Sequence, residues 1–255
     1  MVELDTAHPY PGKQRILGVI PARLASTRLP RKVLRAIAGQ PMIGWVYRAA
    51  RACPLLDQVL IATDSEEVLS FAQEHSLPAV FTPEDCPSGT DRVHAVAQSI
   101  AADIYVNIQG DEPLLRPEHL EALLAPMARP EVEVATLATA CSRDQVTNPN
   151  AVKVVTAANG RALYFSRATI PYDRDGVGGV AYRKHLGIYA YRKSALDRFP
   201  ALPPSRLEAV EKLEQLRFLE NGIDVYVTHT PYDTIGVDTE EDFRAVETLI
   251  LQQEK

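Results

Sequence analysis

The sequence contains few cysteines and no arrangement of them that would bind a metal or form a disulfide framework. Among its 255 residues, Cys53, Cys86 and Cys141 are widely separated and form no CxxC pair. Neither a set of disulfides nor a zinc knuckle is therefore expected, and the thiols should be reduced. Cys86 is either an incidental small residue or a reactive thiol, since reactivity requires an electropositive setting.

Long hydrophobic runs and basic clusters are also missing. No apolar stretch approaches the ~18 residues that cross a bilayer, and Glu3 and Asp5 occupy the start of the chain, where a signal peptide would be basic. The formal net charge is -6, with both signs spread along the chain, so no basic stripe is available for a phosphate backbone. We expect a cytoplasmic protein with neither a membrane nor a nucleic acid as partner.

The first half of the chain alternates between short apolar runs and amphipathic segments. Runs rich in β-branched and aromatic residues predict strands over 15–20, 58–63, 79–82 and 104–109. Helical periodicity begins at Met42, Glu66 and Asp91. This alternation predicts an α/β fold with a Rossmann-like, mainly parallel sheet flanked by helices.

After about residue 130 the pattern changes to α+β, which predicts a smaller lobe. Strands are expected over 132–140, 151–157 and 184–192, with a flexible glycine-rich loop over 173–184. One continuous helix is expected over 206–221, in which Glu208 would pair with Lys212 four residues later. A last strand from Val225 and a terminal helix from Glu240 follow.

Three cations lie on the loop that follows the first strand. The segment PARLASTRLPRK (21–32) contains Arg23, Arg28 and Lys32, at the sheet edge where open α/β folds bind ligands. It contains neither GxGxxG nor GxxxxGK[ST], so it is not a dinucleotide fingerprint or a P-loop. Arginine forks and a lysine suit a triphosphate or pyrophosphate, although charge alone would equally fit a solvated loop.

Two further segments have both a structural and a functional interpretation. In PSGTDR (87–92), Ser88 and Thr90 could cap a helix or contact a base edge. Asp111 in QGDEP follows a strand and could simply make the turn. Asp238 precedes the last helix and could cap it. If both aspartates converge on a triphosphate, they form the kind of site that holds Mg²⁺.

Taken in order, these segments resemble the sugar-activating nucleotidyltransferases, and more narrowly the cytidylyltransferases that activate 3-deoxy-manno-octulosonate. The resemblance covers nearly everything from Arg15 to the end of the chain. Besides PARLASTRLPRK, the matching segments are PSGTDR, VNIQGDEP (106–113), NPNAVKVV (148–155), ALYFSRATIPYDRD (162–175), HLGIYAYR (185–192), LEQLR (213–217) and GVDTEED (236–242). The chain departs from the pattern at Arg31, where relatives often have glycine, at Asp91, where most have glutamate, and in a shorter loop over 173–184.

The resemblance assigns roles to particular residues. It implies that Asp111 and Asp238 hold Mg²⁺, and that Lys32, Arg23, Arg28, Asp111 and Asp238 form the catalytic set. It implies that CTP contacts Pro21, Ala22, Arg23, Arg28, Lys32, Ser88, Thr90, Arg92 and Gln109. It implies that the sugar contacts Arg167, His185, Tyr189, Glu214 and Gln215, with Arg167 meeting the sugar carboxylate. From the residues alone, each member of the sugar set has an ordinary structural interpretation.

The resemblance also implies a fold, a reaction and a domain organisation. The fold is that of the nucleotide-diphospho-sugar transferases, and the reaction converts CTP and the octulosonate to the CMP-sugar and diphosphate for envelope polysaccharide synthesis. Other acidic ketoses and a catalytically silent nucleotide-binding subunit are the alternatives. We expect a flexible extension over 1–14 and one domain over 15–255, in which 15–130 binds nucleotide, 131–235 binds sugar and dimerises, and 236–255 returns to the core. A homodimer is expected.

Overall fold

The computed structural model describes residues 14–24, 29–176 and 178–253. All but the last residue of the expected N-terminal extension lies outside these ranges. The Cα trace forms two compact units: the first runs to Glu121 and resumes at Thr234, and the second is Ala122–Asp233. Within the described ranges, no helix is long and apolar enough to cross a bilayer.

The first unit contains a parallel sheet in the strand order β6-β1-β4-β5. Its strands are β1 (Ile16–Ala22), β4 (Gln58–Thr63), β5 (Ala79–Phe81) and β6 (Ile104–Asn107). The central strands β1 and β4 are almost wholly buried, which explains why their sequences are continuous apolar runs rather than alternating ones. The expected parallel α/β architecture is thus confirmed, although β6 ends two residues earlier than predicted.

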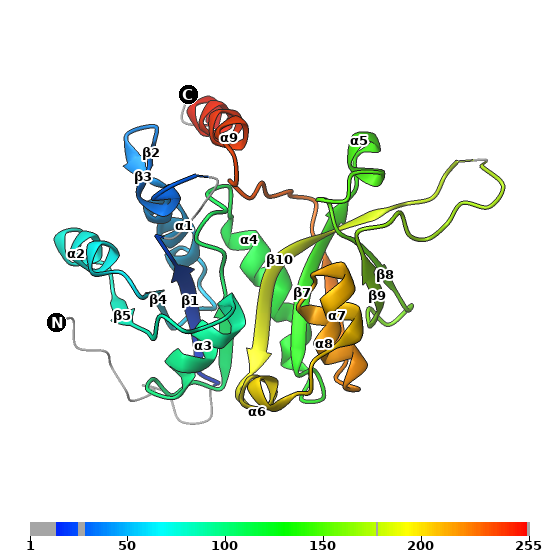
Figure 1. Ribbon diagram of the computed structural model, residues 1–255, viewed down its shortest axis with the longest axis horizontal. Coiled ribbons are helices and arrows are strands. Elements are labelled where there is room, and N and C mark those ends of the chain that lie inside the picture. Colours follow the sequence, from blue (N-terminus) through cyan, green and yellow to red (C-terminus); the bar gives the residue numbers. More distant parts are fainter. Residues whose placement is uncertain (1–13, 25–28, 177, 254–255) are drawn as a thin grey trace. The chain divides into compact units, whose positions relative to one another are not determined.

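Helices connect these strands (Figure 1). They are α1 (Met42–Arg51), α2 (Glu66–Glu74) and α3 (Gly89–Ala97), which begins two residues before the predicted start. The chain moves outward from β1 to β4 to β5 and then returns to β6 on the other side of β1. Right-handed crossovers therefore place α3 on the face opposite α1 and α2. The strand order reverses at β1, and the carboxyl end of such a strand is where open α/β sheets bind ligands.

The C-terminal helix α9 (Glu240–Gln253) belongs to the first unit and packs against its early segments. Its residues Phe243, Val246 and Ile250 share an apolar cluster with Met42 and Trp45 of α1. The short strands β2 (Ala36–Ile37) and β3 (Gln40–Pro41) pair beside α9, and the single turn η1 (Lys32–Leu34) precedes them. This packing fixes the start of α9 next to the loop that follows β1.

The second unit contains a mixed sheet, as expected for the α+β half of the chain. In it β7 (Val134–Ala140) pairs in parallel with β11 (Val225–His229) and antiparallel with β10 (Arg183–Arg192). Beyond β10 follow β8 (Lys153–Thr156) and β9 (Ala162–Ser166); β9 was not predicted as a strand. The remaining elements are α4 (Pro117–Leu124), which spans the boundary between the units, η2 (Ala125–Ala128), α5 (Arg143–Val146), α6 (Lys193–Arg198) and η3 (Phe199–Ala201).

The prediction of one helix over 206–221 is wrong. The segment forms α7 (Arg206–Glu211) and α8 (Gln215–Glu220), separated at Lys212, whose backbone is left-handed (φ 53°, ψ 47°). The expected pair of Glu208 with Lys212 is replaced by a bidentate pair, in which Arg217 donates to both oxygens of Glu208 at 2.7 and 2.5 Å. This tertiary contact across the break is stronger than an exposed i,i+4 pair.

Ser76 ends α2 in a conformation that glycine adopts more easily. Its φ is 55°, and the bonds from Leu77 N to Ala72 O (2.8 Å) and from Ser76 N to Gln73 O (3.1 Å) form a Schellman motif. Because the Cβ of Ser76 is strained there, Ser76→Gly should raise the free energy of unfolding by up to about 1 kcal/mol, and Ser76→Val should lower it. Thermal melting of both variants tests this, and a stabilising valine would contradict it.

Candidate functional site

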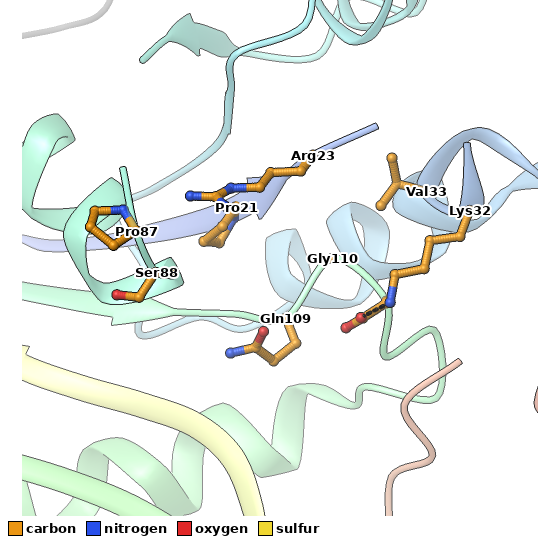
Figure 2. A pocket seen from close by; sticks show the side chains of 10 residues that line it. Pro21, Arg23, Lys32, Val33, Pro87, Ser88, Gln109 and Gly110 are labelled. Atoms are coloured by element: carbon orange, nitrogen blue, oxygen red, sulfur yellow. Dashed lines mark hydrogen bonds and ion pairs between the residues drawn. The ribbon is translucent and has the colours of Figure 1, made fainter. Parts of the chain in front are cut away.

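A cavity of about 290 Å³ lies at the carboxyl ends of β1 and β6 in the first unit. Four segments contribute to it: the end of β1, the turn η1, the start of α3 and the loop after β6 (Figure 2). This is the reversal point of the strand order, as expected for a ligand site in such a sheet. Its lining residues are Pro21, Arg23, Lys32, Val33, Pro87, Ser88, Gly89, Gln109, Gly110 and Asp111.

Gly110 is required by the close approach of two segments at the floor of this cavity. A Cβ atom at this position would lie 2.8 Å from the carbonyl oxygen of Pro21, which is closer than backbone and side-chain atoms can pack. The loop after β6 can therefore contact the end of β1 only with glycine here. Ala22, a predicted nucleotide contact, is fully buried at the end of β1, whereas its neighbour Pro21 lines the cavity.

Lys32 connects the two predicted metal ligands. Its ammonium donates to Asp111 Oδ2 at 2.5 Å, to Asp238 Oδ1 at 2.9 Å and to the carbonyl of Val237 at 3.2 Å. The Val237 amide in turn donates to the Asp111 carbonyl at 2.9 Å, which holds the two loops together. Burial disfavours the charged ammonium, but the hydrogen bonds and charges of both aspartates outweigh this, and the pKa of Lys32 is raised.

Thr239, and not Asp238, is the N-cap residue of α9. The Thr239 hydroxyl accepts from Asp242 N at 3.2 Å, and the Thr239 carbonyl accepts from Phe243 N at 3.1 Å. The Asp242 carboxylate accepts from Thr239 N at 2.8 Å, which completes a reciprocal cap. The helix therefore does not depend on the carboxylate of Asp238, which faces Lys32.

The oxygen atoms of Asp111 and Asp238 fit a divalent cation bound together with phosphate. Both carboxylates contact the same ammonium group, that of Lys32, and both are partly exposed. Throughout the described ranges, no three His, Cys, Asp or Glu side chains gather as a complete metal site. Two carboxylates completed by substrate oxygens are the donor set that Mg²⁺ commonly uses.

Arg23 lines the cavity and has one donor atom that no hydrogen bond within the described ranges uses. Its Nη2 atom is buried without a hydrogen-bond partner among the described residues, while its Nε lies 4.0 Å from Asp64 Oδ2. In Figure 2 the guanidinium lies on the side of Ser88, and Lys32 lies on the other side. The two cations thus flank the cavity, as an anion site requires. Arg28, the third predicted cation, lies outside the described residues.

Helix α3 begins at the cavity with residues of the predicted cytosine site. Ser88 is its N-cap: the hydroxyl accepts from Asp91 N at 3.1 Å and donates to Asp91 Oδ2 at 2.7 Å. It also lines the cavity, so its role as a helix cap does not exclude the predicted contact with a base. Thr90 is buried, and Arg92 has no exposed surface. The Arg92 guanidinium donates to Asp64 and Thr82, so its contacts in this structure lie within the protein.

The predicted sugar-site residues lie in the second unit, where a β-bulge brings two of them together. The register of β10 against β7 shifts between Leu186 and Tyr189, and the Thr136 hydroxyl lies 2.8 Å from the Ile188 carbonyl and 3.0 Å from His185 Nε2. The rings of His185 and Tyr189 are 5.5 Å apart, whereas residues four apart on a regular strand are separated by about 13 Å. The bulge therefore places both rings in one cluster.

Burial controls the ionisation of this cluster. It lowers the pKa of His185 to about 3, so the imidazole is neutral at physiological pH. Burial first, then Tyr191 and the Glu214 carboxylate, raises the pKa of Tyr189 well above its ordinary value. Gln215, the first residue of α8, is 6% exposed, and its Nε2 has no hydrogen-bond partner among the described residues. Neutral groups of this kind suit sugar hydroxyls.

Arg167 is held by the loop between α7 and α8. Its guanidinium donates to the carbonyls of Glu211 (2.7 Å), Pro149 (3.0 Å) and Lys212 (3.4 Å), and its backbone N donates to the Glu211 carboxylate at 2.9 Å. The Arg167 carbonyl accepts from the fully buried Lys153, which also donates to the carbonyls of Asn148 and Ala151. Burial lowers the pKa of Lys153, which has carbonyl oxygens as its hydrogen-bond partners.

Several residues of these clusters were not identified from the sequence. Asp64 follows β4 as Asp111 follows β6, so the same strand-end argument would have found it. Thr136 and Lys153 gave no comparable signal, because a threonine or lysine inside a strand pattern is ordinary. Cys86 is 7% exposed, and burial above all raises the pKa of its thiol; both observations favour the interpretation as an incidental residue over a reactive thiol.

Comparison with known proteins agrees with this arrangement. Residues 17–225 match a family described as "Cytidylyltransferase". The chain is 71% identical over 240 residues to the 3-deoxy-manno-octulosonate cytidylyltransferase of Acidobacterium capsulatum, covering 94% of this chain and 98% of the relative. It is 59% identical over 239 residues to the enzyme of the same name from Koribacter versatilis, covering 94% and 91%.

Solved structures agree as well. One, described as CMP:2-keto-3-deoxy-manno-octonic acid synthetase complexed with CTP, superimposes with a TM-score of 0.90 at 42% identity and covers 94% of this chain and 99% of its own. A putative glucose-1-phosphate thymidylyltransferase from Bacillus anthracis, at 17% identity and a TM-score of 0.65, shares the fold. It covers 92% of this chain and 94% of its own.

The low pKa of His185 predicts a loss of stability in acid. Because the folded pKa of about 3 lies below the ordinary 6.5, the unfolded chain binds an additional proton between these values. The free energy of unfolding is therefore unaffected by His185 above about pH 6.5. It falls as the pH falls, and at pH 5 it is lower by about 2 kcal/mol. Urea denaturation at pH 5 and pH 8 gives the free energy of unfolding of the wild type and of His185→Gln. The loss of this free energy between pH 8 and pH 5 should be smaller for the variant than for the wild type. An equal difference would mean that His185 titrates normally.

Proposed function

The chain belongs to the cytidylyltransferase family, within it to the 3-deoxy-manno-octulosonate cytidylyltransferases, and from this membership we propose that it transfers CMP from CTP to 3-deoxy-manno-octulosonate. The products are the CMP-sugar and diphosphate. The observation that carries the proposal is the cavity at the strand reversal, which is flanked by Arg23 and Lys32 and bordered by Asp111. A relative of 42% identity is described as complexed with CTP.

The cavity chemistry is suited to the departure of diphosphate. The anomeric oxygen of the sugar forms a bond to the α-phosphorus of CTP, the bond from this phosphorus to the bridging oxygen breaks, and the hydroxyl proton is released to solvent. Negative charge accumulates on the leaving diphosphate. Arg23 and Lys32 supply positive charge beside the cavity, and positive charge placed where negative charge develops stabilises the transition state more than the ground state.

We propose Mg²⁺ as the cofactor, held by Asp111 and Asp238. When bound, it would supply charge neutralisation of the phosphate oxygens. Both carboxylates are bound to the Lys32 ammonium, which marks the point between them as a place for positive charge. Lys32 has a flexible side chain with three donors, so with Mg²⁺ held by the aspartates its ammonium would be able to bind a phosphate oxygen instead.

We propose the second unit as the source of the sugar contacts. The neutral His185 and Tyr189 rings and the buried Gln215 amide offer hydrogen-bond groups that are suited to hydroxyls. Arg167 would meet the sugar carboxylate in a charge-assisted contact. Its three carbonyl contacts hold the guanidinium in place without neutralising its charge, which supports this role.

The most direct test measures diphosphate release from the full-length protein. Release should require CTP, Mg²⁺ and the octulosonate together, and it should be slower with other nucleoside triphosphates and with nonulosonates or amino-substituted octulosonates. CTP binding without turnover on any acidic sugar would contradict the proposed transfer and indicate a silent nucleotide-binding subunit.

Assembly and location are part of the same proposal. We propose a homodimer acting in the cytoplasm, whose product supplies envelope polysaccharide synthesis. Light scattering during size-exclusion chromatography measures the oligomeric state.

The aspartates should be essential for turnover but not for folding. Asp111→Asn and Asp238→Asn should each lose about 3 kcal/mol of transition-state stabilisation, a fall in kcat/KM of about two orders of magnitude, because metal placement fails. Steady-state kinetics and thermal melting of each variant test this. Asp242→Asn is the matched control: it weakens the reciprocal cap of α9, in which Thr239 is the N-cap residue, so it should lower the melting temperature and reduce turnover far less than Asp111→Asn or Asp238→Asn. The reverse result for Asp238 and Asp242 would overturn the metal assignment.

Arg167 should affect sugar binding specifically. Arg167→Ala should raise the KM for the sugar tenfold to a hundredfold, which corresponds to about 1.5 to 3 kcal/mol for a lost charge-assisted contact. The CTP affinity without sugar should not change. Arg161→Ala is the control, because it removes an exposed arginine of the same unit that pairs with Asp224. If Arg167→Ala lowers only the melting temperature, its carbonyl contacts account for the residue.

A further inference from the structure

Asp64 occupies a position next to Arg23 that the sheet register determines. In the parallel pair of β1 and β4, Ala22 is the partner of Thr63. The next residues, Arg23 and Asp64, therefore leave the sheet side by side at its carboxyl edge. The distance from Arg23 Nε to Asp64 Oδ2 is 4.0 Å. Asp64 is thus beside the cavity although it does not line it.

Arg92 fixes the Asp64 carboxylate from the other side. Its Nη2 donates to Asp64 Oδ2 at 2.5 Å, and its Nη1 donates to the hydroxyl of Thr82, which follows β5. The Arg92 side chain has no exposed surface, and that of Asp64 is 17% exposed. Breaking a charge pair buried to this extent would leave an uncompensated charge inside the protein, which is strongly unfavourable. The carboxylate therefore has a fixed position.

The two guanidiniums use Asp64 differently. Arg92 is fully buried, and its positive charge is neutralised by the carboxylate of Asp64. Of the three charged groups Arg23, Asp64 and Arg92, a net charge of one remains, on Arg23. The Nε edge of Arg23 faces Asp64, and its Nη2 is buried without a hydrogen-bond partner among the described residues. Arginine binds phosphate oxygens with its terminal nitrogens in a fork. At 4.0 Å, Asp64 attracts the Nε edge without hydrogen-bonding to it, so the donor capacity of Nη2 is not used by Asp64.

We propose that Asp64 is a positioning residue for Arg23, and that Arg92 acts through it rather than on the nucleotide. This inference rests on the proposed function, because it assigns how the cavity grips the phosphates of CTP. An arginine whose orientation is already fixed loses less side-chain freedom when it binds an anion. The selectivity of the cavity for a phosphate chain thus depends on a residue that contacts no ligand.

A double-mutant cycle tests the proposal. The dissociation constants of CTP, diphosphate and cytidine are measured by calorimetry for the wild type, Asp64→Asn, Arg23→Gln and the double variant. Asp64→Asn should raise the dissociation constants of CTP and diphosphate about tenfold, and the dissociation constant of cytidine should stay within twofold of the wild type. In the Arg23→Gln background, Asp64→Asn should have no further effect on CTP, because the residue that it orients is gone.

Asp57→Asn provides the matched control. Asp57 accepts from the backbone N of Ile16 at the opposite, amino edge of the same two strands, so the variant makes the same change in charge away from the cavity. Its CTP affinity should stay within twofold of the wild type. An equal loss of CTP affinity in Asp57→Asn would show that a general disturbance of β1 and β4 explains the effect, and it would overturn the proposal.

The remaining outcomes separate the proposal from a purely structural role. Asp64→Asn could weaken CTP binding by the same factor with and without Arg23→Gln, or weaken cytidine binding as much as CTP binding. Either result would mean that Asp64 supports α3 rather than Arg23, and the proposal would fail. If Asp64→Asn does not fold, the cycle is run with Arg92→Gln present throughout, which removes the buried charge together with its partner. A wild-type protein that binds neither CTP nor diphosphate would instead overturn the proposed function itself.

Discussion

The ammonium of Lys32 is the contact on which the first unit's site depends. It binds the carboxylates of Asp111 and Asp238, which come from the loop after β6 and from the segment before α9. Without a cation between them, two carboxylates this close would repel each other and raise the cost of holding the loops together. Under the proposed function, Mg²⁺ would occupy the place between the two carboxylates that the Lys32 ammonium takes here, so folding and ligand binding would rely on the same electrostatic requirement.

Two buried cations in this chain are stabilised in opposite ways. Arg92 is paired with the carboxylate of Asp64, so its charge is largely neutralised inside the protein. Lys153 donates to three carbonyl oxygens, which satisfy its donors but leave its charge uncompensated by a hydrogen-bonded carboxylate, and its pKa is lowered by burial. The first arrangement fixes a strand end beside the cavity. The second ties the carbonyl of Arg167 to the loop that contains Asn148 and Ala151.

In the second unit a backbone irregularity has the organising role that a charge has in the first. The bulge in β10 lets one threonine hydroxyl reach the carbonyls of Leu186 and Ile188, and it brings His185 close to Tyr189. The resulting environment keeps the imidazole neutral. A regular strand would have placed these rings too far apart to share one environment.

The sequence by itself determined those features that depend on local order. Periodicity and strand-end position predicted the parallel sheet, the cationic loop and the placement of Asp111 at its edge, because parallel strands necessarily deliver their carboxyl ends to one side. Only the tertiary structure decided that Lys32 binds both aspartates, that Thr239 rather than Asp238 caps the last helix, and that Arg92 faces Asp64. It also decided that the segment 206–221 breaks at Lys212, where Arg217 binds Glu208. These outcomes depend on contacts between residues that are distant in sequence or lie across a turn. Such contacts contribute more free energy than the local helix and strand propensities that a sequence pattern reflects.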